Sequence, residues 1–310
     1  MIRGGAIGDF ILTLPAIAAL RRRFPAAHLE VLGYPHIAQL ALAGGLVNRV
    51  QSIEARALAG FFARGGDLAE DLAAYFSEFD LILSYLYDPD GIFQANVGLC
   101  TGAQFITGPH RADAAAGRHA AKVYLEPLQR LAIFDADPVP RLALASSSPS
   151  LEPRGSTLRP LAVHPGSGSE LKNWPEDKWA ELLGCLAKTT EFNLLLVGGE
   201  AEGDRLHRLS AALPPVRWRL AQSLPLADLA QRLAGCRAFI GHDSGISHLA
   251  AAVGLPGLVL WGDTAEAIWR PPSERVVVLR HAGGLNGLPA AEVLAQLRRV
   301  LGEGDGPALA

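Results

Sequence analysis

The sequence predicts an α/β protein with two Rossmann-like, doubly wound parallel-sheet domains. Short runs of aliphatic residues alternate with helical patterns along the 310 residues, which is typical of βα units. A stretch rich in Ser and Pro, 145–160, interrupts this alternation and is typical of an interdomain linker. We therefore expect one domain over 1–150 and a second over 151–310, facing each other across a cleft.

In the first half, apolar runs and helical spacing alternate. They predict strands at 28–34, 47–53, 79–86 and 104–108, and helices at 15–24, 54–75, 92–100 and 119–132. A first strand at 1–3 is too short for the middle of a sheet. Either the true start of the protein lies upstream, or the sheet begins with a stub.

The second half shows the same alternation of apolar runs and helical spacing. It predicts strands at 161–166, 193–199, 237–243, 256–262 and 275–280, and helices at 174–188, 204–213, 226–236 and 248–254. The last helix, 290–302, can pack on its own domain or back on the N-terminal one. We expect the tail 303–310 to be frayed.

Composition limits the classes of function. Hydrophobic residues make up 49% of the chain and the formal net charge is −3, which favours a globular protein and argues against a nucleic-acid partner. Cys100, Cys185 and Cys236 form no Cys-x-x-Cys pattern, so we expect buried thiols in a reducing compartment and no metal site. There is neither a signal peptide pattern nor a run of about 18 apolar residues. We expect a cytoplasmic protein.

The N-terminal stretch GGAIGD places Asp9 at the mouth of a glycine-rich turn. Ligands of open α/β sheets bind beyond the carboxyl ends of the strands, and Asp9 lies just after such an end. The carboxylate is either the N-cap of the following helix or a general base that takes a proton from a substrate hydroxyl. The pattern alone leaves both interpretations open.

The stretch HPGSGSELKNWP follows the first strand of the second half. Gly166, Ser167 and Gly168 offer backbone N–H groups and a hydroxyl, as anion-binding turns do. Lys172 follows before a helix and can neutralise a phosphate without a metal. The alternative is a surface turn with a solvated lysine.

The stretch GHDSGISHL marks another junction between a strand and a helix. The N–H groups near Ser244 and Gly245 should leave the helix end, where the dipole favours an anion. His248 lies one turn further on the same side, unless it is a hydrogen-bonded core histidine. Beside a diphosphate, Asp243 is either a cap turned away or a ligand for the hydroxyls of an attached sugar. At the next strand end, Thr264 can contact the same ligand.

Together these stretches resemble glycosyltransferase family 9, the ADP-heptose:lipopolysaccharide heptosyltransferases. The resemblance is carried by RGGAIGDFILTLPA, HPGSGSELKNWP, LLLVGGE and GHDSGISHLAAA, in this order and spacing. It implies the GT-B fold, an N-terminal domain that receives the acceptor, and a C-terminal domain that binds the nucleotide-sugar without a metal or other cofactor.

The resemblance also implies roles for residues. Asp9 matches the general base of the family, Lys172 matches the lysine at the donor phosphates, and Asp243 resembles the residue that binds the donor sugar. Ser167, Gly168, Ser244, Gly245 and His248 would complete the donor site. The implied reaction moves a heptose, or a related sugar, from an ADP-sugar with inversion at the anomeric carbon.

The acceptor is less defined by the sequence. The resemblance implies a lipopolysaccharide core or similar glycan, lipid-linked or soluble, with peripheral contact at the inner membrane leaflet in the lipid-linked case. Candidates for binding an acidic or phosphorylated acceptor are Arg56, Arg64, Arg111, Arg118 and Lys122. Two alternatives stay open: a catalytically silent nucleotide-binding scaffold, and a GT-B enzyme that uses another nucleotide-sugar, such as a UDP-sugar. A nicotinamide-dependent enzyme is disfavoured because the G-x-G-x-x-G fingerprint is absent.

Overall fold

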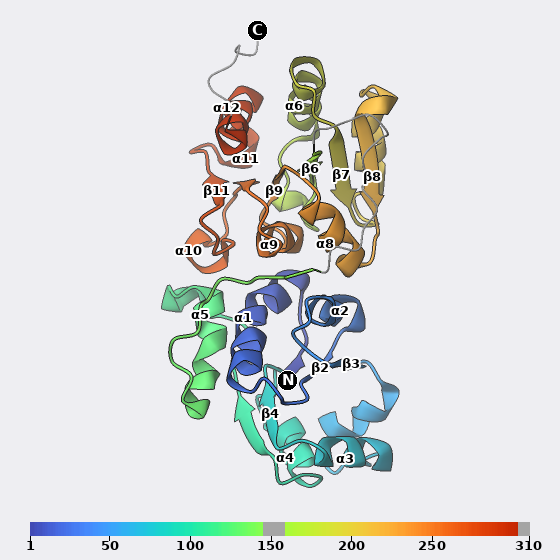
Figure 1. Cartoon of the computed structure of the whole chain (residues 1–310), viewed down its shortest axis with the longest axis vertical. Helices are drawn as coiled ribbons and strands as arrows, with labels where there is room; N and C mark the ends of the chain where they lie inside the picture. The colour runs from blue at the N-terminus through green and yellow to red at the C-terminus, as the bar shows by residue number, and fades with distance from the viewer. Residues whose placement is uncertain (145–158, 303–310) are drawn as a thin grey trace. The chain divides into compact units, whose positions relative to one another are not determined.

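The computed structural model describes residues 1–144 and 159–302, and the chain divides into two compact units, Met1–Pro138 and Val139–Ala310. Each unit is built on one parallel sheet with packed helices (Figure 1). The expected domain boundary at 150/151, most of the expected linker 145–160 and the tail 303–310 lie outside the described residues. The predicted fold class, two doubly wound α/β sheets, is confirmed.

The first sheet has the strand order β3-β2-β1-β4-β5, the order of a Rossmann half. Its strands are β1 (Ile2–Arg3), β2 (Glu30–Gly33), β3 (Arg49–Ser52), β4 (Leu81–Ser84) and β5 (Gln104–Thr107). The expectation that so short a first strand cannot be central is wrong, because Ile2 pairs with both Leu32 and Ser84. Burial of both residues of β1, Ile2 in the apolar core and Arg3 in a polar cluster, holds the stub in place.

Helices cover both faces of the first sheet. The helical segments are α1 (Ile7–Arg23), α2 (Pro35–Ala43), η1 (Arg56–Phe62), α3 (Glu70–Ser77), α4 (Ile92–Gly98), η2 (Ala114–Ala116), α5 (Ala120–Leu125) and η3 (Glu126–Leu131). Phe61, Phe76 and Phe93 bring η1, α3 and α4 into one core, while α1 packs against α2 and α5. The predicted helix 54–75 is wrong, since a loop containing two glycines separates η1 from α3. The helix α2 was not predicted.

The second sheet has the strand order β11-β10-β9-β6-β7-β8. Its strands are β6 (Leu161–Val163), β7 (Leu194–Gly198), β8 (Trp218–Gln222), β9 (Ala238–His242), β10 (Gly257–Leu260) and β11 (Val276–Leu279). The strand β8 was not predicted, because this edge strand is only partly buried and its sequence, WRLAQ, is not an apolar run.

The helices of the second unit complete the doubly wound pattern. They are η4 (Glu170–Lys172), α6 (Glu176–Thr189), α7 (Gly203–Ala211), η5 (Pro215–Arg217), α8 (Leu226–Ala234), α9 (Gly245–Ala252), α10 (Glu266–Trp269), α11 (Gly284–Gly287) and α12 (Ala290–Leu301). Val293 and Leu297 of α12 are buried in one core with Leu182 of α6 and Leu260 of β10. Of the two packings left open for the last helix, the structure shows the one on its own unit.

The structure also bears on two expectations from composition. The three cysteines are free, but only Cys236 is buried, and its burial raises the pKa of the thiol to about 12. Cys100, which follows α4, and Cys185, which lies within α6, are partly exposed, so the expectation of buried thiols holds for Cys236 alone. In the described part of the chain, no helix combines the length and the apolar character that a membrane crossing requires.

Candidate functional site

A lysine, an aspartate and a threonine from three neighbouring loops meet at one edge of the second sheet. Lys172 ends η4 after β6, Asp243 follows β9 directly, and Thr264 follows β10. Oδ2 of Asp243 accepts a hydrogen bond from Nζ of Lys172 at 2.8 Å and one from Oγ1 of Thr264 at 2.7 Å. Since β10, β9 and β6 are adjacent, the strand order brings these loops together at the switch point of the sheet.

The two charged groups of this cluster differ in their access to solvent. The side chain of Lys172 is 40% exposed, whereas that of Asp243 is 10% exposed. Within residues 1–144 and 159–302, only Oδ2 of Asp243 receives hydrogen bonds. The exposed ammonium can donate hydrogen bonds to phosphate oxygens. The second carboxylate oxygen, Oδ1, can accept hydrogen bonds from sugar hydroxyls at a neighbouring position.

The N-terminus of α9 lies at the same strand end. Ser244 is its N-cap, and Oγ of Ser244 accepts a hydrogen bond from the N–H of Ser247 at 3.4 Å. The interpretation of Asp243 as the cap is therefore wrong, because the helix begins one residue later than that interpretation requires. Gly245 opens the helix, so its N–H leaves the helix end, where the dipole favours anions. His248, one turn further, is buried at 5% exposure.

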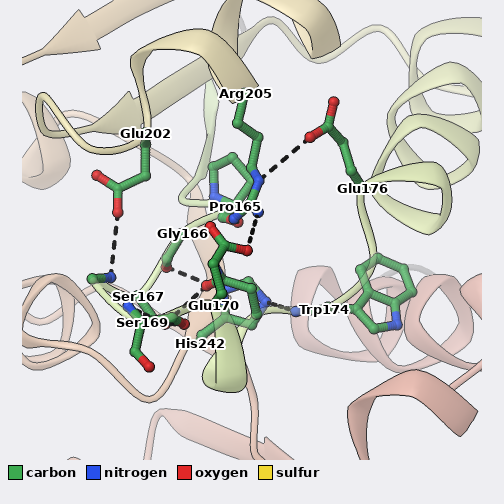
Figure 2. A network of polar contacts seen from close by, with 12 residues as sticks. Pro165, Gly166, Ser167, Ser169, Glu170, Trp174, Glu176, Glu202, Arg205 and His242 are labelled. Atoms are coloured by element: carbon green, nitrogen blue, oxygen red, sulfur yellow. Dashed lines mark hydrogen bonds and ion pairs between the residues drawn. The ribbon is translucent and has the colours of Figure 1, made fainter.

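The buried imidazole of His242 fixes the loop that carries Lys172 (Figure 2). Its Nε2 accepts a hydrogen bond from the N–H of Trp174 at 2.8 Å. The proton of the neutral ring is therefore on Nδ1, which donates to the carbonyl of Gly166 at 3.1 Å. One side chain thus ties both ends of the loop to β9, and this connection sets the position of Lys172 relative to Asp243.

The carboxylate of Glu202 occupies the glycine turn of this loop. It accepts hydrogen bonds from the N–H of Gly168 at 3.3 Å and of Gly199 at 2.9 Å. A Cβ at Gly166 would lie 2.1 Å from Cγ of Glu202, so this position requires glycine. The sequence predicted that this turn binds an anion of a ligand, but in this structure the N–H of Gly168 is bonded to an internal carboxylate. Oγ of Ser167 donates to the carbonyl of Ser169 at 2.8 Å.

Arg205 supports the same loop from α7. Its guanidinium donates to the carbonyl of Pro165 at 3.2 Å and to Glu170 at 2.7 Å, and its Nε lies 3.6 Å from Oε2 of Glu176 (Figure 2). The side chain of Arg205 is 14% exposed, so it is held more firmly than a surface arginine. The loop is therefore positioned from two sides before any ligand binds.

Lowering the pH from 7 to 5 is expected to reduce the free energy of unfolding of the second unit by about 4 kcal/mol. Burial lowers the pKa of His164 to about 4 and that of His242 to about 3. An unfolded histidine has a pKa of about 6.5, so below that pH the unfolded chain takes up protons that the folded chain does not bind. The stability that the two neutral histidines contribute is fully present above the unfolded pKa of about 6.5. It is lost as the pH falls toward their pKa values in the folded protein, about 4 and about 3. Urea titrations at both pH values measure the loss.

Tryptophan fluorescence makes this measurement specific, because all five tryptophans lie in the second unit. The control is His242→Gln, which can accept and donate similar hydrogen bonds but does not titrate. It should lose about 2 kcal/mol over the same pH step. Equal losses in the variant and the parent protein would contradict the assignment to His242.

In the first unit, Asp9 lies in the first turn of α1 after the end of β1. The N-cap is Ala6, so the interpretation of Asp9 as the helix cap is wrong, because α1 begins two residues before it. The side chain of Asp9 is 27% exposed, and its Oδ1 accepts a hydrogen bond from the hydroxyl of Tyr124 at 3.1 Å. A partly accessible carboxylate at a strand end has the placement that a proton acceptor needs.

The five candidates for acceptor binding are all exposed but are not all together. Arg118 and Lys122 line one open cavity of about 660 Å³, where Arg118 also pairs with Glu126. Arg56 is the first residue of η1, Arg64 follows the end of η1, and Arg111 follows β5; none of these three lines that cavity. The structure thus places two of the five side by side.

Four residues around the candidate sites were missed from the sequence: Glu202, Arg205, His242 and Tyr124. Glu202 follows the glycines at the end of β7, and His242 immediately precedes Asp243, so reading every strand end would have found both. Tyr124 is 115 residues from Asp9, and a single sequence carries no signal for that contact. In the described ranges, no group of three or more His, Cys, Asp or Glu side chains is placed to hold a metal ion.

In the comparisons of the sequence with known proteins, the family model and two relatives are all heptosyltransferases. Residues 106–288 match the sequence model of "Glycosyltransferase family 9 (heptosyltransferase)". Lipopolysaccharide heptosyltransferase 1 of Pseudomonas aeruginosa is 40% identical over 93 residues, which span 30% of this chain and only 26% of that protein. Lipopolysaccharide heptosyltransferase 3 of Escherichia coli is 22% identical over 95% of this chain and 96% of its own length.

Comparison with solved structures shows the fold over nearly the whole chain. A family 9 glycosyltransferase from Veillonella parvula has a TM-score of 0.77 at 18% identity, covering 97% of this chain and 96% of its own. Escherichia coli heptosyltransferase WaaC with ADP has a TM-score of 0.75 at 19% identity, covering 96% and 98%. These likenesses confirm the GT-B class predicted from the sequence.

The match to the family model spans more than half of this chain. The chain therefore belongs to glycosyltransferase family 9, the heptosyltransferase family.

Proposed function

We propose that this protein transfers a heptose, or a related sugar, from an ADP-sugar to a hydroxyl of a lipopolysaccharide core or similar glycan. The observation that carries the proposal is the meeting of Lys172, Asp243 and Thr264 at the carboxyl ends of three adjacent strands. Family membership supports the reaction class, and the heptosyltransferase structures with ADP and with ADP-2-deoxy-2-fluoro heptose support the donor.

In the proposed mechanism, Asp9 accepts the proton of the acceptor hydroxyl. The acceptor oxygen then forms a bond to the anomeric carbon from the face opposite ADP, and the bond from that carbon to the phosphate oxygen breaks. The electron pair leaves with ADP, and the configuration at the anomeric carbon is inverted. Asp9 can do this in the site because its carboxylate is partly exposed.

The negative charge that grows on the departing ADP needs a positive counterpart. Lys172 supplies an ammonium that is still 40% exposed, and the N–H groups near Ser244 and Gly245 supply the helix end. Asp243, whose Oδ1 receives no hydrogen bond from the residues that the structure describes, would bind hydroxyls of the donor sugar. In this proposal Ser167, Gly168 and His248 line the donor site, and no metal ion takes part.

The first experiment is a calorimetric titration with ADP, UDP, GDP and NAD in the presence of EDTA. We expect ADP to bind selectively, since the proposed charge stabilisation comes from protein groups. A preference for UDP would keep the reaction class and change the donor, whereas a preference for NAD would overturn the proposal. Absence of nucleotide binding would contradict the donor site.

The second step of this test is transfer itself, measured as release of ADP from ADP-heptose in the presence of a lipopolysaccharide-core acceptor. We expect turnover to persist in EDTA. Turnover that stops in EDTA and returns with magnesium or manganese would contradict the metal-independent mechanism. ADP binding without turnover on any core acceptor would favour the silent scaffold.

A further inference from the structure

Around Asp9, the first unit holds a buried polar cluster that the proposed chemistry leaves unexplained. Its members are Arg3, Tyr85 and Tyr124, each at most 2% exposed. The hydroxyl of Tyr124 donates to Oδ1 of Asp9 at 3.1 Å. The hydroxyl of Tyr85 donates to the backbone carbonyl of Tyr124. The cluster thus joins β1, α1, α5 and the end of β4, and it ends on one carboxylate oxygen.

Arg3 fixes the geometry of this cluster. One guanidinium nitrogen donates to the carbonyl of His110 at 2.7 Å, and the other donates to the backbone carbonyl of Asp9 at 3.3 Å. The guanidinium carbon lies 4.5 Å from the centre of the Tyr124 ring, a cation–π contact. The second nitrogen is also 3.8 Å from Oδ1 of Asp9. Arg3 therefore holds both partners of the hydrogen bond between Tyr124 and Asp9.

The two carboxylate oxygens of Asp9 have different surroundings. Oδ1 faces Tyr124 and Arg3, which are both buried. Oδ2 faces Gly5, whose φ is +99°, and a Cβ built there would lie 3.5 Å from this oxygen. A side chain at Gly5 would cover Oδ2, whereas glycine leaves this oxygen uncovered on that side. Within the part of the chain that the structure describes, Oδ1 is thus held by Tyr124 and Arg3, whereas Oδ2 receives no hydrogen bond.

We propose that Tyr124 is a positioning residue for Asp9: it holds Oδ1 and thereby presents Oδ2 to the acceptor hydroxyl, a role that rests on the proposed function of Asp9 as proton acceptor. A carboxylate fixed at one oxygen cannot rotate away from its substrate, and such orientation contributes strongly to rate. Burial raises the pKa of Tyr124, so its hydroxyl keeps its proton and stays a donor across the working pH range.

The experiment compares Tyr124→Phe with Tyr85→Phe. Each variant removes one buried hydroxyl, and the two rings pack edge to face with centroids 6.0 Å apart. Only Tyr124→Phe removes the hydrogen bond to Asp9. We expect it to lower kcat about ten- to hundredfold with unchanged KM for the donor and unchanged ADP affinity, while Tyr85→Phe, which leaves that hydrogen bond in place, loses clearly less kcat than Tyr124→Phe. Melting temperatures measure the loss of stability in both.

Crystal structures of the two variants give a readout that does not depend on turnover. We expect Asp9 to change rotamer, or to divide between rotamers, in Tyr124→Phe and to stay in place in Tyr85→Phe. An unmoved Asp9 together with a parental kcat in Tyr124→Phe would overturn the proposal, and so would equal losses of kcat in both variants. If Asp9→Asn keeps full activity, the role of Asp9 as base fails, which is a separate result.

Discussion

An Asp9→Asn variant is expected to transfer sugar about a hundred- to ten-thousandfold more slowly than the parent protein, the contribution typical of a general base. The amide has nearly the shape of the carboxylate, and its oxygen can still accept the hydrogen bond that Tyr124 donates to Oδ1. It cannot take up the proton of the acceptor hydroxyl. The rate constant of ADP release at saturating donor and acceptor measures the effect.

The affinity for ADP should not change in this variant, because Asp9 belongs to the first unit and the proposed donor residues to the second. Asp113→Asn is the matched control. Asp113 is an exposed aspartate of the same unit that accepts a hydrogen bond from the N–H of Ala115, and its loss should leave kcat as it is. A variant at Asp9 that keeps most of the parental rate would exclude this carboxylate as the base and leave the donor site intact.

The fold was predictable because its signals are local. Buried parallel strands are short apolar runs, and the crossover helices repeat at regular intervals, so the class and most strands follow from periodicity. The errors arose where that signal is weak. The edge strand β8, Trp218–Gln222, is only partly buried. The strand β1, Ile2–Arg3, is stabilised by pairing with β2 and β4, which two residues are too short to indicate by themselves.

The residues of the candidate sites that follow the carboxyl end of a strand were predictable from the sequence. Lys172, Asp243 and Thr264 each follow a strand, and the strand order brings them into contact. Some of the contacts that hold those groups in position do not follow this rule. Tyr124 meets Asp9 from a helix far along the chain, and the occupation of the glycine turn by Glu202 depends on the packing of α7. Such contacts are set by tertiary structure and not by local pattern.

A Lys172→Met variant is expected to lose a hundred- to a thousandfold in kcat/KM, about the effect of removing one electrostatic contact to developing charge. Nζ of Lys172 is the accessible cation of the cluster, since its side chain is 40% exposed and bonded to a largely buried Asp243. Without this ammonium, the N-terminus of α9 is the main source of positive potential at the departing ADP, and the leaving group is stabilised less. ADP affinity, measured by calorimetry, should fall with it.

Lys178→Met is the matched control, because Lys178 lies in the same unit and, among the described residues, donates to the backbone carbonyls of Asn286 and Leu288 and to no side chain. A double variant, Lys172→Met with Asp243→Asn, separates two explanations for the loss. If Lys172 serves only to neutralise Asp243, removing both charges restores ADP affinity. If Lys172 binds the phosphates, affinity stays low in the double variant, and that is the result we expect. Restoration would move the phosphate site from Lys172 to the N-terminus of α9 alone.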